Sequence, residues 1–244
     1  MTPGDATLSP APRRAAGVRE RARAELTREI VAEARRQLAE VGPAALSLRA
    51  VAREIGMVSS AVYRYVASRD ELLTLLIVEA YDALGAAVER AEAAVVRDDL
   101  RSRWQATCRA MRDWARANPH EHSLIFGSPV PGYAAPQTTI GPASRVPTVL
   151  IGILVDGLHR GLIDPDGVAA LPEAVQRSLD PIRDQVAPLP DELLARGLAA
   201  WTLLVGAVSF ELFGHTHNVV DDDPVLQAAF FDDQMRRAAD LVGL

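Results

Sequence analysis

The sequence predicts an all-α protein in two parts: a three-helix head that contains a helix-turn-helix, and a bundle of about six further helices. Apolar residues recur at helical spacing between breaks made of glycine and proline. No segment shows the strict alternation of a half-buried strand. Near residue 50, the pattern of apolar and small residues indicates a short helix, a glycine turn and a second short helix.

Charge is divided unevenly along the 244 residues. Residues 1–69 contain 12 arginines and 7 acidic residues, a balance of +5, whereas the remainder contains 14 and 25, a balance of −11; together they give −6. A basic head on an acidic body is typical of a nucleic-acid-binding protein. Chance clustering of charge on solvated helices is the alternative.

A single cysteine, Cys108, excludes an intrachain disulfide and a cysteine-based zinc site. It lies on an apolar helix face, which indicates a core thiol. No uninterrupted apolar run reaches the ~18 residues of a membrane span, and the first residues lack the apolar core of a signal peptide. These observations predict a cytoplasmic protein.

Three domains are expected along the chain. Residues 1–20 are predicted to form a disordered basic arm, because proline, glycine, alanine and serine give way to arginines. Such an arm either touches DNA phosphates or only improves solubility. Residues 21–68 form the head, with a first helix from about residue 24 to Val41 that Gly42 and Pro43 end. Residues 69–244 form the ligand-binding and dimerisation domain.

The two short helices of the head are defined by caps and one glycine. Ser47 is a predicted N-cap. Gly56 suits the left-handed turn that ends the first helix. Ser59 or Ser60 is expected to cap the second. The inward-facing apolar residues are Leu48, Val51, Ala52, Ile55, Val62 and Val66.

The outer face of the second short helix carries the chemistry for DNA. Tyrosine hydroxyls at helical spacing can reach a backbone phosphate, and Arg49 or Arg69 can add charge there. Ser60, Ala61 and Arg64 are the candidates for reading base edges, because arginine bonds guanine and an alanine methyl packs on thymine. The alternative is that the two tyrosines, Tyr63 and Tyr65, merely pack against the first helix.

The stretch LSLRAVAREIGMVSSAVYRYVASRDELL resembles the DNA-binding signature of the TetR family of bacterial transcriptional regulators, a likeness that covers about residues 24–75. Met57-Val58 and Val66 depart from the family's usual pattern. The resemblance implies a homodimer on a palindromic DNA operator, acting as a repressor that a small molecule releases. No cofactor is predicted. It also implies that DNA is contacted by Ser47, Arg49, Ser59, Ser60, Ala61, Tyr63, Tyr65 and Arg69.

The remaining helices are expected at 68–94, 99–117, 144–160, 191–213 and 224–240, with a short helical turn at 120–125. Ser68 and Glu71 form a predicted capping box at the start of the first of these. Residues 126–136 are a loop, because three prolines and two glycines oppose regular structure. Residues 164–190 carry five prolines and are expected to be a partly helical crossover.

A seam of apolar residues in the helix 191–213 predicts the dimer interface. Its spacing of 4, 3, 4, 3, 4 has the 3.5-residue period of a helical bundle. The alternative is that the seam faces the core of its own chain. Residues 201–215 and 124–129 also resemble one TetR subgroup. The predicted interface consists of Leu194, Leu198, Trp201, Val205, Val208 and Leu212, with Phe230 from the last helix.

A ligand pocket is expected among the body helices, lined by large apolar side chains. Core packing explains each candidate equally well. The candidates are Trp104, Met111, Trp114, Phe126, Tyr133, Ile153 and His159.

No catalytic or metal site is predicted. Three pairs have partial metal-ligand spacing, but none has a third ligand: His120 with His122, His215 with His217, and Asp156 with His159. No nucleophile-base set or phosphate loop is present. A ligand-released repressor is therefore favoured over two alternatives: a helical enzyme whose head is only a docking module, and a DNA-binding protein that responds to no ligand.

Overall fold

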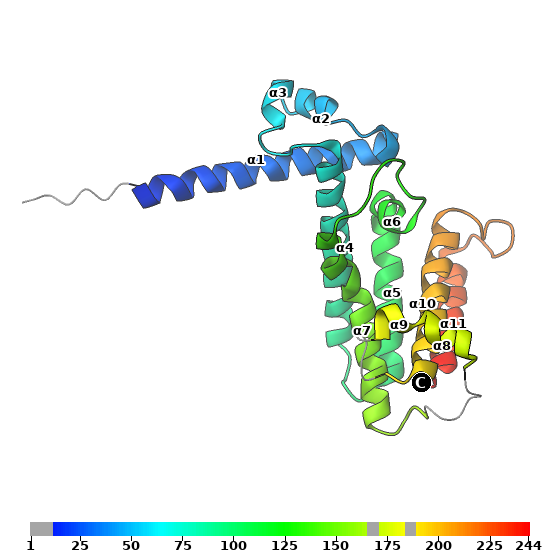
Figure 1. Cartoon of the computed structure of the whole chain (residues 1–244). Coiled ribbons are helices and arrows are strands. Elements are labelled where there is room, and N and C mark those ends of the chain that lie inside the picture. The colour runs from blue at the N-terminus through cyan, green and yellow to red at the C-terminus, as the bar shows by residue number, and fades with distance from the viewer. Residues whose placement is uncertain (1–11, 165–170, 184–188) are drawn as a thin grey trace, which may run out of the picture. The chain divides into compact units, whose positions relative to one another are not determined.

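The computed structural model describes residues 12–164, 171–183 and 189–244, with side chains from residue 19 onward (Figure 1). All regular structure in these ranges is helical, which confirms the predicted fold class. The helices are α1 (Pro12–Val41), α2 (Leu48–Glu54), α3 (Ser59–Val62), α4 (Arg69–Ala93), α5 (Leu100–Ala117), α6 (Pro119–Phe126), α7 (Ile140–His159), α8 (Glu173–Ser178), α9 (Asp180–Arg183), α10 (Asp191–Leu212) and α11 (Pro224–Val242), with 3-10 turns η1 (Pro43–Ala45) and η2 (Gln137–Thr139).

The chain divides into two compact units. The amino-terminal unit extends to Leu76 and includes Pro129–Ala134, and the carboxy-terminal unit comprises Ile77–Ser128 and Ala135–Leu244. This division differs from the predicted boundary at residue 69, because the first turns of α4 and part of the proline-rich loop pack with the head. Within that unit, the Tyr133 hydroxyl lies 2.9 Å from the Thr74 hydroxyl. A loop has no periodicity from which such a partner could be predicted.

The first helix begins earlier than expected. α1 starts at Pro12, so residues 12–20 of the predicted disordered arm are helical. Proline is favoured at the first helical position because its missing N–H would have no partner there. Arginine, alanine and glutamate, which are good helix formers, follow it. The rest of the predicted arm, residues 1–11, lies outside the described residues.

The core of the amino-terminal unit forms where α1, η1, α2 and α3 meet. The predicted apolar stripe of α1 is buried between Ile30 and Leu38. Val51 and Ala52 of α2 are fully buried beneath it, as is Val62 of α3. Each short helix thus turns one apolar face inward and leaves the other face free for external contacts.

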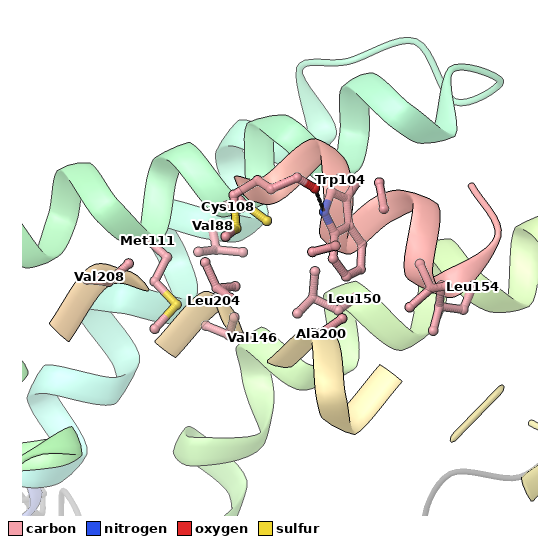
Figure 2. Packing of buried hydrophobic residues seen from close by; sticks show 14 of the residues in the cluster. Val88, Trp104, Cys108, Met111, Val146, Leu150, Leu154, Ala200, Leu204 and Val208 are labelled. Carbon is pink, nitrogen blue, oxygen red and sulfur yellow. Dashed lines mark hydrogen bonds between the residues drawn. The ribbon is translucent and has the colours of Figure 1, made fainter. Parts of the chain in front are cut away.

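The core of the carboxy-terminal unit surrounds α5, which packs against α7, α10 and α11 (Figure 2). Trp104 is 1% exposed, and its indole N–H donates a 3.0 Å hydrogen bond to the Met235 carbonyl of α11. Cys108 lies one turn further along, fully buried, and burial raises the pKa of its thiol far above the usual range. The predicted core thiol is confirmed.

α7 and α10 are long and apolar enough to cross a membrane by length and composition alone. Both contribute buried side chains to the core just described, including Leu150 from α7 and Leu204 from α10. Length and composition alone are weak evidence for a membrane span, because core helices can pass the same test.

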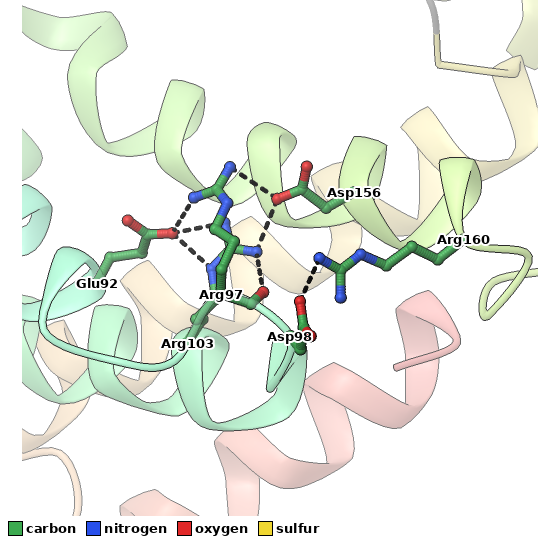
Figure 3. Close-up of polar contacts among 6 residues, drawn as sticks. All are labelled: Glu92, Arg97, Asp98, Arg103, Asp156 and Arg160. Carbon is green, nitrogen blue, oxygen red and sulfur yellow. Dashed lines mark hydrogen bonds and ion pairs between the residues drawn. The ribbon is translucent and has the colours of Figure 1, made fainter.

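A buried arginine ties three helices of this unit together (Figure 3). The Arg103 side chain is 1% exposed and donates to Glu92 of α4 at 2.6 Å and to Asp156 of α7 at 2.7 Å. Arg97 bonds the same two carboxylates, at 3.0 Å and 2.8 Å. Each buried charge has several partners, so desolvation of the guanidinium is compensated.

Candidate nucleic-acid interface

The turn between α2 and α3 has the geometry that the sequence predicts. The Ser47 hydroxyl accepts a long 3.5 Å bond from the Ala50 N–H and caps α2. Gly56 has φ of 69°, the left-handed conformation that glycine adopts without strain. The Met57 N–H then donates to the Ala52 carbonyl at 2.8 Å, which closes the end of α2.

The second short helix differs in its cap and its length. Val58 occupies the N-cap and offers no side-chain bond, so the predicted cap at Ser59 or Ser60 is wrong. Both serines instead lie in the first turn of α3 and are exposed. After Val62 the chain continues in tight turns, in which Val66 donates its N–H to the Val62 carbonyl at 3.0 Å. The serine hydroxyls are therefore available to an external partner.

We call Ser59, Ser60, Ala61, Tyr63 and Arg64 the reading surface. Ser59, Ser60 and Arg64 are exposed, Tyr63 is 44% exposed and Ala61 is half-buried. Tyr65 is half-buried, so Tyr63 is the more exposed of the two tyrosines.

Two arginines in this region have no acidic partner. In the described part of the chain, the guanidinium groups of Arg49 and Arg64 form no ion pair with a carboxylate. Both side chains are exposed. The Arg64 carbonyl accepts a 3.2 Å hydrogen bond from Arg23 of α1, which fixes the chain where the reading surface ends. The reading surface thus carries one unpaired positive charge, that of Arg64, on a backbone held by α1, and α2 carries a second, that of Arg49.

Arg69, a predicted DNA contact, is engaged within the fold. Its guanidinium donates to the carbonyls of Pro43 at 2.8 Å, Ala44 at 3.1 Å and Leu46 at 3.2 Å. These carbonyls belong to η1 and the residue after it, and the bonds join that turn to the first turn of α4. Arg69 therefore has a structural role whether or not it also meets a phosphate.

The start of α4 is closed by a variant of the predicted capping box, in which the Glu71 carboxylate bonds the residue before Ser68. The Ser68 hydroxyl accepts a 3.0 Å bond from the Glu71 N–H. In return, the Glu71 carboxylate accepts a 2.5 Å bond from the Ala67 N–H. The reciprocal pair fixes the entry to α4 directly after the short helices.

The carboxy-terminal unit contains a cavity of about 260 Å³, which we call the inner cavity. It lies among α5, α7 and α10, with residues near α9 closing one side. Trp104 is the one predicted pocket residue among those that line it. The lining comprises Trp104, Ser144, Pro147, Thr148, Leu150, Ile151, Leu154, Ile182, Leu189, Leu194, Gly197, Leu198 and Trp201.

The other six pocket candidates lie elsewhere. Met111 and Ile153 are fully buried in side-chain packing, and Trp114 is 9% exposed in the same core. Tyr133 belongs to the amino-terminal unit. His159 is exposed at the end of α7, and Phe126 packs edge-on against Tyr81 and Trp201. The missed lining residues of α7 surround Pro147, and a proline inside a predicted helix was the available signal.

Much of the predicted dimer seam packs against its own chain. Leu194 and Val208 are 4% and 2% exposed. Leu194, Leu198 and Trp201 line the inner cavity, and Val205 and Leu212 pack against the core. Much of the seam therefore packs against its own chain, because a 3.5-residue period identifies a packed face without showing which chain covers it. A dimer contact through Leu198, which is 38% exposed, stays a prediction.

The opposite face of α10 is the exposed one. Leu203 is 37% exposed, and Phe210, two turns further on, is 58% exposed. With α11 they border a groove of about 360 Å³, the outer groove, which also includes Gly206 and the predicted interface residue Phe230. A β-carbon added at Gly206 would meet nothing within 4 Å, so the groove floor is open to a close neighbour.

His122 is a buried histidine of the carboxy-terminal unit whose pKa is shifted by its surroundings. It is fully buried, with Nε2 3.1 Å from the Ser209 hydroxyl and its ring 5.0 Å from that of Phe126. Nδ1 has no hydrogen-bond partner among the described residues. Burial lowers the pKa of His122 to about 4, so the ring is neutral at physiological pH. The other member of its predicted metal pair, His120, is exposed.

Known proteins resemble the chain in both units. Residues 30–76 match the family described as bacterial regulatory proteins, tetR family, and residues 104–238 match the tetracyclin repressor-like C-terminal domain. The HTH-type transcriptional regulator Rv1816 of Mycobacterium tuberculosis is 43% identical over 223 residues, which cover 90% of this chain and 93% of that protein.

Solved structures agree with this assignment. The regulatory protein SCO4313 has a TM-score of 0.72 at 33% identity, covering 90% of this chain and 97% of its own. The TetR family regulator PfmR from Thermus thermophilus shares the fold, with a TM-score of 0.54 at 20% identity over 88% of this chain and 96% of its own. The chain belongs to the TetR family of transcriptional regulators, and its amino-terminal unit carries the family's DNA-binding helix-turn-helix.

Proposed function

We propose that the protein is a cytoplasmic, homodimeric repressor that binds a palindromic DNA operator and leaves it when a small molecule occupies the carboxy-terminal unit. The observation that carries the proposal is the reading surface. It combines the exposed serine hydroxyls of α3, which follows a glycine turn, with an exposed tyrosine and an unpaired arginine in the turns directly after α3. Such a face suits the major groove, because its side chains offer hydrogen bonds to both phosphates and base edges.

Each polar group of this region has a proposed role on DNA. Ser59, Tyr63 and Arg49 contact backbone phosphates, which position the protein without selecting sequence. Ser60, Ala61 and Arg64 face base edges and select sequence. Ser47, Tyr65 and Arg69, which the fold already engages or half-buries, support these contacts through the backbone they hold.

The proposed dimer uses the outer groove. A palindrome is read by two identical units related by a twofold axis, so one surface patch must meet its own copy. The exposed apolar residues Leu203, Phe210 and Phe230 form such a patch on α10 and α11. Open space at Gly206 allows the helix of a second copy to approach closely. Four helices, two from each copy, would then bury the patch.

Release by a ligand is proposed to act through α7. Six residues of α7 line the inner cavity, and all but the first of them lie between Arg145 and Asp156. Arg145 bonds Asp82 and Glu89 of α4, and Asp156 bonds Arg103, which in turn bonds Glu92 of α4. A ligand that displaces α7 therefore pulls on α4 at both ends of the cavity. Because α4 contributes residues to both units, its shift is the proposed signal to the head.

Selection of bound duplexes from a random DNA pool tests the proposal. The expected product is a palindrome whose half-sites are spaced by about one helical turn, with affinity that falls steeply as salt rises. The double variant Ser60→Ala, Arg64→Ala should select no common sequence while keeping its melting temperature. Recovery of unrelated sequences by the wild-type protein would contradict operator recognition.

A further inference from the structure

The lining of the inner cavity determines which ligands it can accept. Two aromatic residues, Trp104 of α5 and Trp201 of α10, form part of the wall. Leucine, isoleucine, proline and glycine supply most of the remainder, and none of the described lining residues is charged. A charged ligand would gain no counter-ion from these residues for the hydration that it loses on entry, which is unfavourable. The cavity therefore selects against ions.

Few polar groups are available to a ligand. The Trp104 indole N–H already donates to the Met235 carbonyl, and the Ser144 hydroxyl donates to the Ile140 carbonyl at 2.8 Å. The Thr148 hydroxyl forms no hydrogen bond with any residue that the structure describes. Beside it, Pro147 lacks the N–H that would donate to the Ala143 carbonyl in a regular helix. The α7 wall thus offers a hydroxyl next to a weakened helical turn.

The volume indicates how large a molecule the cavity can enclose. An engineered apolar cavity of about 150 Å³ accepts benzene. The inner cavity, at about 260 Å³, is larger than that cavity and has room for a molecule with two rings instead of one. A molecule of roughly ten to twelve non-hydrogen atoms fits that space by the same comparison.

From these features we infer that the inner cavity binds a neutral, mainly apolar molecule of two-ring size with one hydroxyl or carbonyl group, which hydrogen-bonds to Thr148. The regulatory meaning of this site rests on the proposed function, whereas the binding chemistry rests on the lining alone. The tryptophan faces supply stacking area, and the single polar contact orients the ligand.

Calorimetric titration of the full chain with naphthol and with naphthoate at neutral pH tests the inference. The two probes have similar size and differ in charge. Naphthol should bind, and naphthoate should bind at least ~10-fold more weakly, because its carboxylate has no partner in the cavity. Binding of neither probe, or equal binding of both, would overturn the inference.

Two variants place the ligand in the cavity. Thr148→Val should weaken naphthol ~2- to 10-fold, the loss of one neutral hydrogen bond, and leave naphthalene unchanged. The same change at exposed Thr138, outside the lining, is its control. Leu198→Arg adds a cation to the wall at a 38% exposed position and should reverse the preference towards naphthoate. Leu162→Arg, 62% exposed and outside the lining, should leave the preference unchanged.

Failure of this inference is distinguishable from failure of the proposed function. Calorimetry on the free protein involves no DNA, so its outcome stands whether or not an operator is found. Conversely, selection of duplex DNA without added ligand tests the reading surface alone. Unchanged naphthol affinity in both Thr148→Val and Leu198→Arg, with their melting temperatures retained, would exclude the inner cavity as the site.

Discussion

Arg145 of α7 crosses α4 at Gly85: a β-carbon at residue 85 would lie 2.6 Å from the Arg145 Nε and 2.8 Å from its Cβ. This glycine lets the guanidinium reach both Glu89, at 2.6 Å and 2.8 Å, and Asp82, at 2.9 Å. Helix interiors disfavour glycine, so its presence here is explained by the close approach of the arginine rather than by helix stability.

Gly85→Ala should therefore destabilise the protein, by about 1–3 kcal/mol, because overpacking outweighs the gain in helix propensity. Chemical denaturation monitored by circular dichroism measures the change. Gly152→Ala in α7 is the matched control: a β-carbon there meets nothing within 4 Å, and the variant should be stabilised. If Gly85→Ala and Gly152→Ala were both stabilised, the Arg145 side chain would have moved to make room for the added methyl group.

The stability of the protein should depend on pH through His122. Its pKa in the folded state is about 4, against an ordinary value of 6.5, so between these values only the unfolded chain takes up the proton. The free energy of unfolding should fall as pH falls through this window, by about 2 kcal/mol between pH 8 and pH 5.

Urea unfolding of wild-type protein and of His122→Asn at several pH values isolates this contribution. The variant should lose most of the slope between pH 7 and pH 5, whatever its absolute stability. His159→Asn, at the exposed end of α7, should keep the wild-type slope. An unaltered slope in His122→Asn would assign the acid sensitivity to other groups.

Arg49 and Tyr63 should contribute to DNA affinity without supporting the fold. Arg49→Ala or Tyr63→Phe should each weaken operator binding by about 1–3 kcal/mol, because each removes a polar contact at the DNA backbone. Electrophoretic mobility shifts on the selected duplex measure the loss. Arg53→Ala lies on the same helix, where the Arg53 side chain is 77% exposed, and should change affinity little. Equal effects of the Arg49 and Arg53 changes would indicate only a general charge effect.

Arg69→Ala should act first on stability. The Arg69 guanidinium serves three backbone carbonyls, so its removal should lower the free energy of unfolding by about 1–3 kcal/mol. Proteolysis of the amino-terminal unit and thermal melting report this loss. Arg69→Lys should restore little of the lost stability, because an ammonium group lacks the planar set of N–H donors of a guanidinium. A variant that melts like the wild type but binds DNA poorly would instead establish a direct phosphate contact.

Two leucines of nearly equal exposure on α10 separate the two possible dimer faces. Leu203, 37% exposed, borders the outer groove, and Leu198, 38% exposed, lines the inner cavity. Leu203→Arg should produce monomers in light scattering and abolish operator binding, because two arginines would face each other across the twofold axis. Leu198→Arg should remain dimeric. If only Leu198→Arg produced monomers, the dimer interface would be the α10 seam that the sequence predicts, and not the outer groove.

Much of the head was predictable because its signals are local. The cap at Ser47, the left-handed Gly56 and the capping box of Ser68 with Glu71 each involve residues within a few positions of one another. The cap of α3 was not predicted correctly, since Val58 takes that position without a side-chain bond. A serine hydroxyl suits either a cap or a DNA contact, and its sequence position alone does not choose between them.

The carboxy-terminal unit was predicted in outline but not in its surfaces. The seam of α10 was identified correctly as a packed stripe, yet Leu194 and Val208 proved to face their own core. A second apolar face of α10, with Leu203 and Phe210, was not predicted to be the exposed one, because α10 is apolar on both sides. The pocket candidates were large residues, whereas the cavity forms where Pro147, Thr148 and Gly197 leave space.

By itself the sequence determined the helical class, the helix-turn-helix and the family likeness, because periodicity, caps and a glycine turn act over one or two turns of chain. Only the tertiary structure decided that Arg69 holds η1, that Tyr133 meets Thr74, and that Arg145 crosses Gly85. These contacts join residues 26, 59 and 60 positions apart, so they depend on how helices pack rather than on any local pattern. Packing also decided which face of α10 encloses a cavity and which is left exposed.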